Sequence, residues 1–315
     1  PPAPGPDGRL YGTTTAGGAS QHGAVYVLDP AAAAVTIGAD VPGATRAAGL
    51  RVSNSSLAVG ADNALYGTTS QGGTLGAGTV FKLNTDGTGF TVLQNFDYST
   101  TGGYVYAGLL QGTDGALYGM ANSGGLSGAG TLFKLNTDGT GFTVLQNFNY
   151  STTGAYPFGA TLMQGADGAL YGAATSGGTF GAGTAFKLNT DGTGFTVLQN
   201  FSFITTGGNP FAALIQGTDG ALYGTTFFGD SNAGSVFRLT TDGSEFAVLK
   251  VLQTGPEVSA EGGFPYAGLT EGLDGALYGT RSDGGSGGGG TVFKVDRDGT
   301  AFVTLRSFSG SNSGD

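Results

Sequence analysis

The chain has 315 residues, a formal net charge of -10 and a pI near 4.3, and only 11% of its residues are charged. This balance argues against nucleic acid and anionic lipid as partners, because both carry negative charge. The absence of cysteine excludes disulfides, thiol nucleophiles and cysteine-ligated zinc, and 64 glycines without a Gly-X-Y period exclude a collagen-like chain.

No apolar run reaches the roughly 18 residues that a membrane-spanning helix needs, so we expect no membrane insertion. The first residues, PPAPGPDG, lack the basic and apolar regions of a secretory leader. Few charges and many Thr, Ser, Asn and Gly residues fit a mature protein that is extracellular or displayed on a cell surface.

A Leu-Tyr-Gly triplet recurs along the chain and sets its register. It starts at Leu10, Leu65, Leu117, Leu170, Leu222 and Leu277, with spacings of 55, 52, 53, 52 and 55 residues. A period of this length without helical patterning is typical of propeller blades. The six copies predict one domain over residues 1–308, followed by a disordered tail at 309–315.

The first copy departs from the others at both ends. Pro1–Gly5 is a poor match for a first strand, and Ala31–Ala34 stands where a fourth strand should start. An irregular outer strand is the interpretation we favour for this segment. How the first and last copies meet is not predicted by the pattern.

The copy around Leu117 shows the internal structure of one unit. Residues 107–111, 116–121, 130–136 and 142–148 have the length and composition of strands, and Asp-Gly turns at 114–115 and 138–139 join them in pairs. This predicts a four-stranded antiparallel meander. The Gly-rich loop 122–129 and the longer loop 149–158 then lie at the end opposite the Asp-Gly turns.

Six such sheets predict an all-β fold, a six-bladed β-propeller of four-stranded antiparallel blades. Ala-Gly, Gly-Ala or Ala-Ala pairs at 107–108, 159–160, 212–213 and 267–268 fit a first strand near a narrow axis. The rival architecture is a parallel β-helix, which does not need two Asp-Gly hairpins in every repeat. Lys82, Lys134, Lys187, Arg238 and Lys294 on the third strands are interpreted as charges that protect outer edges.

With the unit defined, the segments DGALYGTTS and GGTLGAGTVFKLNTDGTGFTVL and their sister copies resemble the GloVer repeat of bacterial choice-of-anchor tandem repeat proteins. The resemblance extends over nearly the whole chain. It implies a bacterial, extracellular, propeller-like protein and brings no activity or catalytic residues with it. No anchor pattern is visible before Asp315.

Aromatic residues gather in the loops before the first strand of several units. The predicted ligand-binding residues are Tyr104, Tyr106, Tyr156, Phe158, Phe211, Phe264 and Tyr266. Their rings, beside Asn, Thr and Ser groups, suit the apolar faces and hydroxyl rims of sugars. The alternative is that each ring fills a gap between blades.

Charges that break the repeat are candidates for catalysis. They are Glu257, Glu261, Arg281, Asp283 and His22, which ring closure would bring to one sector of the loop face between the last and first blades. A carboxylate pair there could serve glycoside hydrolysis, and an arginine with a tyrosine or histidine could serve a polysaccharide lyase. The alternative is a set of solvated loop charges.

These patterns support two main functional hypotheses. The first is a non-catalytic extracellular propeller that binds carbohydrate or another polymer through aromatic loops, and the second is a carbohydrate-active enzyme. A spacer or assembly module is a third. No cofactor or metal is expected, because Asn84-Thr85-Asp86-Gly87 and Asp296-Arg297-Asp298-Gly299 lack the further ligands of a calcium loop.

Overall fold

The computed structural model of this chain describes residues 2–14, 24–32, 34–40, 51–52, 56–229, 233–252, 264–285 and 288–309. These residues form strands, turns and loops. The described part contains no helix long and apolar enough to cross a membrane. The chain divides into two compact units, Pro1–Asn149 with Tyr156–Leu162 and Tyr150–Ala155 with Met163–Asp315.

Unit 1 holds the first three sheets. Blade 1 consists of β1 (Ala3–Pro4), β2 (Leu10–Thr14), β3 (Ala24–Asp29) and β4 (Ala34–Asp40). Blade 2 consists of β5 (Arg51–Val52), β6 (Ala58–Val59), β7 (Leu65–Gln71), β8 (Thr79–Leu83) and β9 (Thr91–Asn95), with β5 and β6 both paired to β7. Blade 3 consists of β10 (Leu110–Gln111), β11 (Leu117–Ala121), β12 (Thr131–Leu135) and β13 (Thr143–Asn147).

Unit 2 holds the other three sheets. Blade 4 consists of β14 (Met163–Gln164), β15 (Leu170–Ala174), β16 (Thr184–Leu188) and β17 (Thr196–Asn200). Blade 5 consists of β18 (Ile215–Gln216), β19 (Leu222–Thr226), β20 (Ser235–Leu239) and β21 (Phe246–Val251). Blade 6 consists of β22 (Thr270–Glu271), β23 (Leu277–Arg281), β24 (Gly288–Val295) and β25 (Phe302–Ser309).

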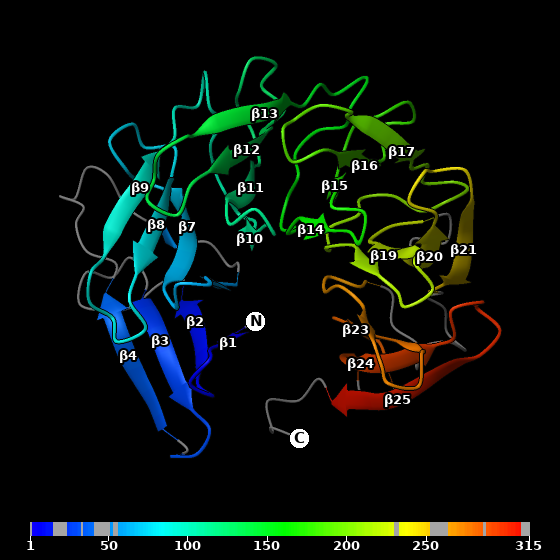
Figure 1. The fold of residues 1–315 in the computed structure, drawn as a ribbon. Coiled ribbons are helices and arrows are strands. Elements are labelled where there is room, and N and C mark those ends of the chain that lie inside the picture. The colour runs from blue at the N-terminus through cyan, green and yellow to red at the C-terminus, as the bar shows by residue number, and fades with distance from the viewer. Residues whose placement is uncertain are drawn as a thin grey trace. The chain divides into compact units, whose positions relative to one another are not determined.

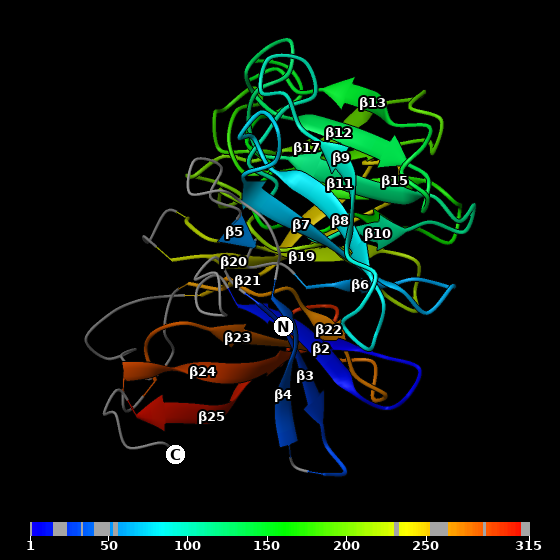
Figure 2. The same cartoon turned by 90° about the vertical axis from the view of Figure 1, so that its left-hand side faces the viewer.

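Five sheets are antiparallel meanders with their four strands in sequence order, and blade 2 differs only in having both β5 and β6 beside β7. The six sheets are the blades of a six-bladed β-propeller. In unit 1 the fourth strands β4, β9 and β13 lie on the outer side, and in unit 2 β17, β21 and β25 do (Figure 1). Figure 2 shows strands β2, β3 and β4 of blade 1 in succession across one sheet. The predicted fold class is confirmed.

Apolar cores lie between consecutive blades within each unit. In unit 1, one buried cluster joins residues of blades 1 and 2, and another joins blades 2 and 3. In unit 2, the clusters join blades 4 and 5 and blades 5 and 6. A blade therefore buries its faces against its neighbours, which explains why one repeat cannot fold alone.

The Leu-Tyr-Gly register has a packing cause. Gly119 of β11 lies opposite Phe133 of β12, and a Cβ atom at Gly119 would stand 2.5 Å from Phe133 Cζ and 2.8 Å from Leu109 Cδ2. An equivalent Phe ring of the third strand fills this space at Gly67, Gly224 and Gly279. The triplet needs glycine because a phenyl ring occupies the position of its side chain.

Each Asp-Gly turn between the first two strands also anchors a polar network. In blade 3 the Tyr118 hydroxyl donates to Asp114 Oδ2 at 2.6 Å, and Lys134 Nζ donates to the same oxygen at 2.8 Å. Lys134 Nζ also lies 5.3 Å from the centroid of the Tyr118 ring. The interpretation of these cations as edge charges was wrong, because they lie on third strands, inside the sheet, and pair with the turn.

This network predicts a loss of stability in acid. Partial burial raises the pKa of Asp114, but hydrogen bonds from Lys134 and Tyr118 outweigh it and hold the pKa below its ordinary 3.8. Hydrogen bonds from Lys294 and Tyr278 lower the pKa of the equivalent Asp274 to about 2. A lowered folded-state pKa stabilises the fold above pH 3.8, and this contribution is lost as the pH falls toward 2. We expect the urea unfolding midpoint to fall over this interval.

The matched variant is Asp114→Asn, which keeps the turn but removes the ionisable group. It is expected to lower the free energy of unfolding near neutral pH by about 1 kcal/mol, because charge-assisted hydrogen bonds are lost from a partly exposed site. Its unfolding midpoint should also change less between pH 4 and pH 2 than that of the wild type. An equal acid response in both proteins would contradict the role given to Asp114.

Two predictions about first strands need correction. The first strand of blade 3 was expected at 107–111, but β10 covers only Leu110–Gln111. Ala107 instead precedes the strand as a buried residue whose carbonyl accepts a hydrogen bond from Thr68 Oγ1 at 3.2 Å, so the small residue serves close approach between blades 2 and 3. Pro1–Gly5 contains a strand after all, because Ala3 and Pro4 pair with Tyr11 and Leu10. Ser309 ends β25, and 310–315 lie outside the described residues.

Candidate functional site

The predicted ligand-binding residues lie in loops that enter the first strand of a blade. Tyr106 precedes β10 and Phe158 precedes β14, and their ring centroids are 4.8 Å apart in unit 1. Phe211 precedes β18 and Tyr266 precedes β22, with ring centroids 6.2 Å apart in unit 2. The structure thus brings these rings together in pairs from consecutive blades.

A grouping of five rings lies in unit 2, and we call it the aromatic cluster: Phe211, Phe227, Phe228, Phe264 and Tyr266. Phe227 is its centre, with ring centroids 4.6 Å from those of Phe228 and Tyr266. Phe264 stacks on Phe227 at 4.7 Å and 21°, and Phe211 meets it edge-on at 5.1 Å. Phe227 is 8% exposed, whereas Tyr266 is 60% exposed. The cluster therefore presents one open ring on a packed base.

Two members of the aromatic cluster, Phe227 and Phe228, were missed by the sequence reasoning. They follow β19 in the loop between the second and third strands of blade 5. Blades 2, 3, 4 and 6 have polar pairs at this point, at 70–71, 122–123, 175–176 and 282–283. The signal in the sequence is the pair Phe227-Phe228, which replaces the polar pair of the repeat.

The backbone fixes the loops that carry these rings. The Gly208 amide donates to the Phe228 carbonyl at 2.6 Å, and the Asn209 amide donates to the Ala182 carbonyl at 2.7 Å, so this loop bridges blades 4 and 5. Asn209 has φ 54°, in the left-handed region that costs energy for a residue other than glycine. Tyr104 and Tyr156, the equivalents in earlier blades, have φ 56° and 54°. These two predicted residues shape the loop by their backbone.

The charged candidates for catalysis are placed as follows. Arg281, at the end of β23, is 3% exposed, and its guanidinium carbon lies 5.2 Å from the Phe293 ring centroid and 4.9 Å from that of Phe302. Asp283 Oδ1 accepts the Phe264 amide at 3.1 Å. Asp283 therefore holds the loop of the aromatic cluster. Glu257, Glu261 and His22 lie outside the described residues.

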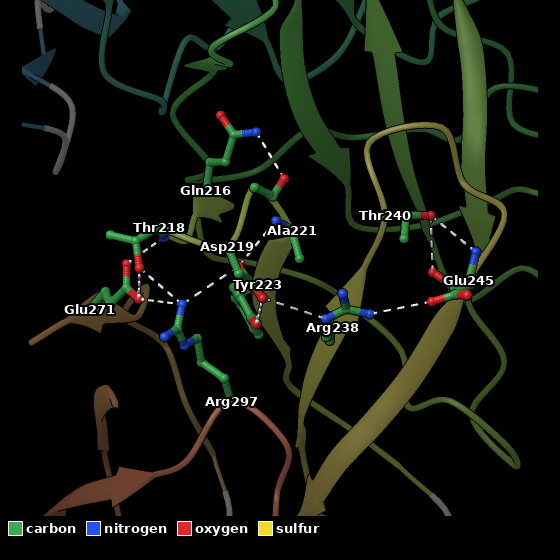
Figure 3. Close-up of polar contacts among 11 residues, drawn as sticks. Gln216, Thr218, Asp219, Ala221, Tyr223, Arg238, Thr240, Glu245, Glu271 and Arg297 are labelled. Carbon is green, nitrogen blue, oxygen red and sulfur yellow. Dashed lines mark hydrogen bonds and ion pairs between the residues drawn. The ribbon is translucent and has the colours of Figure 1, made fainter. Parts of the chain in front are cut away.

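A polar network in unit 2 lies at the end of blades 5 and 6 where the Asp-Gly turns are found (Figure 3). Thr218 donates its amide to Glu271 Oε2 at 2.8 Å and its hydroxyl to Oε1 at 3.0 Å, which joins blade 5 to blade 6. Arg297 Nη1 lies 3.1 Å from Glu271 Oε1 and donates to Thr218 Oγ1 at 2.9 Å. We call Thr218, Glu271 and Arg297 the polar clamp.

The polar clamp also departs from the repeat. Gln111 and Gln216 stand where blade 6 has Glu271, and each accepts an amide hydrogen bond from the preceding blade. Thr85, Thr137, Thr190 and Thr241 stand where blade 6 has Arg297. The acid and its cation thus occur in the same blade. Within the described ranges, no group of three or more His, Asp or Glu side chains could hold a metal ion.

Comparison with known proteins identifies a repeat family and a fold. The family model described as the Gloeobacter/Verrucomicrobia repeat matches residues 2–226 and 161–315. No curated protein matches the chain. A chain from the crystal structure of a nidogen/laminin complex aligns with TM-score 0.54 and 16% identity over 96% of this chain and 92% of its own length.

A second solved structure, from Bacteroides uniformis ATCC 8492 and provisionally named a 6-phosphogluconolactonase, aligns with TM-score 0.56 and 15% identity. The alignment covers 95% of this chain and 81% of that one. At such identities the likeness concerns the fold alone.

Proposed function

The chain belongs to the Gloeobacter/Verrucomicrobia repeat family, and from the aromatic cluster that this member carries we propose that it is a secreted or surface-displayed propeller that binds a carbohydrate polymer without transforming it. The observation that carries the proposal is the open ring of Tyr266, 60% exposed on a base of packed aromatic side chains. Large exposed rings on a rigid loop are typical of binding sites.

The chemistry of the cluster suits a sugar. An aromatic face attracts the C–H bonds on the apolar face of a pyranose, and a tyrosine adds a hydroxyl that can bond to the sugar's rim. The half-buried ring of Phe211, with its centroid 6.2 Å from that of Tyr266, extends the aromatic surface to the loop of the neighbouring blade. A polymer that crosses the loops of blades 5 and 6 would contact both rings.

Binding without catalysis is supported by the positions of the two charged candidates that lie among the described residues, Arg281 and Asp283. Arg281 packs against Phe293 and Phe302, and the Asp283 carboxylate accepts a hydrogen bond from the Phe264 amide. Catalysis of glycoside cleavage needs two carboxyl groups that reach the substrate. The low charge content and polar composition support the extracellular setting.

Tyr266→Ala is expected to weaken binding of the preferred polysaccharide at least about tenfold, because a stacking contact with an exposed aromatic ring is removed. The measurement is a polysaccharide panel in affinity gel electrophoresis, followed by calorimetry on the strongest ligand. Reducing-end and unsaturated-uronate assays on the same panel test for turnover.

The matched control is Phe180→Ala, because Phe180 is 62% exposed in the same unit but lies in a different loop, between β15 and β16. It should leave the affinity unchanged. Equal losses for the two variants would contradict a site at the aromatic cluster. Turnover of any polysaccharide would contradict the non-catalytic part of the proposal.

A further inference from the structure

We propose that the aromatic cluster selects an uncharged polysaccharide, an inference that rests on the proposed function and narrows its ligand class. The proposal depends on where the charges of unit 2 lie relative to the rings. It also depends on how the Tyr266 ring is held.

The described segments of the loops around the cluster are almost free of charge. The described segments of the loops that carry the cluster are 201–214, 227–229, 233–234 and 264–269, with 282–285 beside them, and the only charged residue among these is Asp283. Its carboxylate accepts the Phe264 amide. An anionic polymer would therefore meet a carboxylate here and no cation, and would lose hydration without an ionic contact in return.

Seven cations lie in unit 2, and two of them are on fourth strands: Lys250 of β21 lies 4.7 Å from the Phe302 ring centroid, and Arg306 of β25 is exposed. The other five form ion pairs or lie against phenyl rings. Lys187, Arg238 and Lys294 form ion pairs with the aspartates of the Asp-Gly turns, at the opposite end of their blades. Arg297 belongs to the polar clamp at that same end. Arg281 lies against two phenyl rings and is 3% exposed. The charge distribution of this unit therefore favours a neutral ligand at the aromatic end.

The Tyr266 ring is held before a ligand arrives. Pro265, which is buried, fixes the backbone on one side of it, and the Phe227 ring packs 4.6 Å behind it. A preorganised ring loses little side-chain entropy on binding, so stacking alone can support useful affinity. A neutral sugar depends on this advantage, because its binding gains no long-range electrostatic attraction.

The test compares neutral with anionic polymers of similar length on the full chain. Mixed-linkage β-glucan and xylan are the neutral probes, and alginate and polygalacturonate are the anionic probes, each measured at low and high salt. We expect a neutral polymer to bind at least tenfold more tightly than either anionic one. Its affinity should change less than twofold with salt, since no ion pair forms. Tyr266→Phe should keep this affinity, whereas Tyr266→Ala should lose it.

The outcomes separate this inference from the proposed function. Salt-sensitive binding of alginate or polygalacturonate that Tyr266→Ala removes would overturn the uncharged class and leave a carbohydrate site in place. Binding of a proline-rich peptide but of no polysaccharide would overturn both. Thermal unfolding of each variant shows whether a lost affinity reflects a lost fold.

Discussion

Gly119→Ala is expected to lower the free energy of unfolding by about 2 kcal/mol, because one added methyl group overfills a packed site. The new Cβ would stand 2.5 Å from Phe133 Cζ and 2.8 Å from Leu109 Cδ2, and both side chains belong to the core between blades 2 and 3. The backbone of Gly119 is not in the left-handed region, so space alone causes the loss. Urea unfolding at neutral pH measures it.

A double mutant separates crowding from other effects of the new side chain. Phe133→Leu shortens the ring that occupies the space and should itself be destabilising, because it leaves a cavity. In Gly119→Ala/Phe133→Leu the methyl group enters that cavity, so the combined loss should be smaller than the sum of the two single losses. Additive losses would show that Phe133 is not the reason for glycine in the triplet.

The fold could be predicted because its signals are local and repeated. Asp114-Gly115 and Asp138-Gly139 mark hairpins on their own, and Gly115 and Gly139 do have the positive φ, 81° and 86°, that such turns require. The extent of β10 could not be predicted in this way. Ala107 fits the pattern of a strand, but its carbonyl accepts a hydrogen bond from Thr68 of the neighbouring blade. Thr68 is distant in the sequence, so the local pattern does not show this partner.

Part of the candidate site could also be predicted, because its residues occupy repeated positions. The sequence places Phe211 and Tyr266 in equivalent loops, and the repeat alone indicates that they face a common end. It does not indicate that Phe227, from a loop between the second and third strands, packs against both. The ion pairs of the third-strand cations could not be predicted, because their partners are far away in the sequence. Lys134 is 20 residues from Asp114, and only the antiparallel register of Tyr118 with Lys134 brings the two together.

Disruption of the polar clamp is expected to cause a second large loss of stability. Arg297→Thr, which introduces the residue found in blades 2 to 5, should lower the free energy of unfolding by about 2 kcal/mol, because it leaves a largely buried carboxylate without its cation. The Glu271 side chain is only 12% exposed, and Arg297 Nη1 lies 3.1 Å from its Oε1. Arg297 also donates to Thr218, so the variant loses a bond on each side of the joint between blades 5 and 6.

Glu271→Gln on this background distinguishes a charge effect from lost packing. The double variant Glu271→Gln/Arg297→Thr carries the Gln and Thr found in blades 3 and 4, where Gln164 donates its amide to the Gly168 carbonyl. A glutamine at 271 could donate in the same way to Gly275 and needs no cation. We therefore expect the double variant to recover most of the stability that Arg297→Thr loses, as measured by urea unfolding. If it is no more stable than the single variant, then Arg297 stabilises the joint by packing, and the paired departure from the repeat is not an electrostatic exchange.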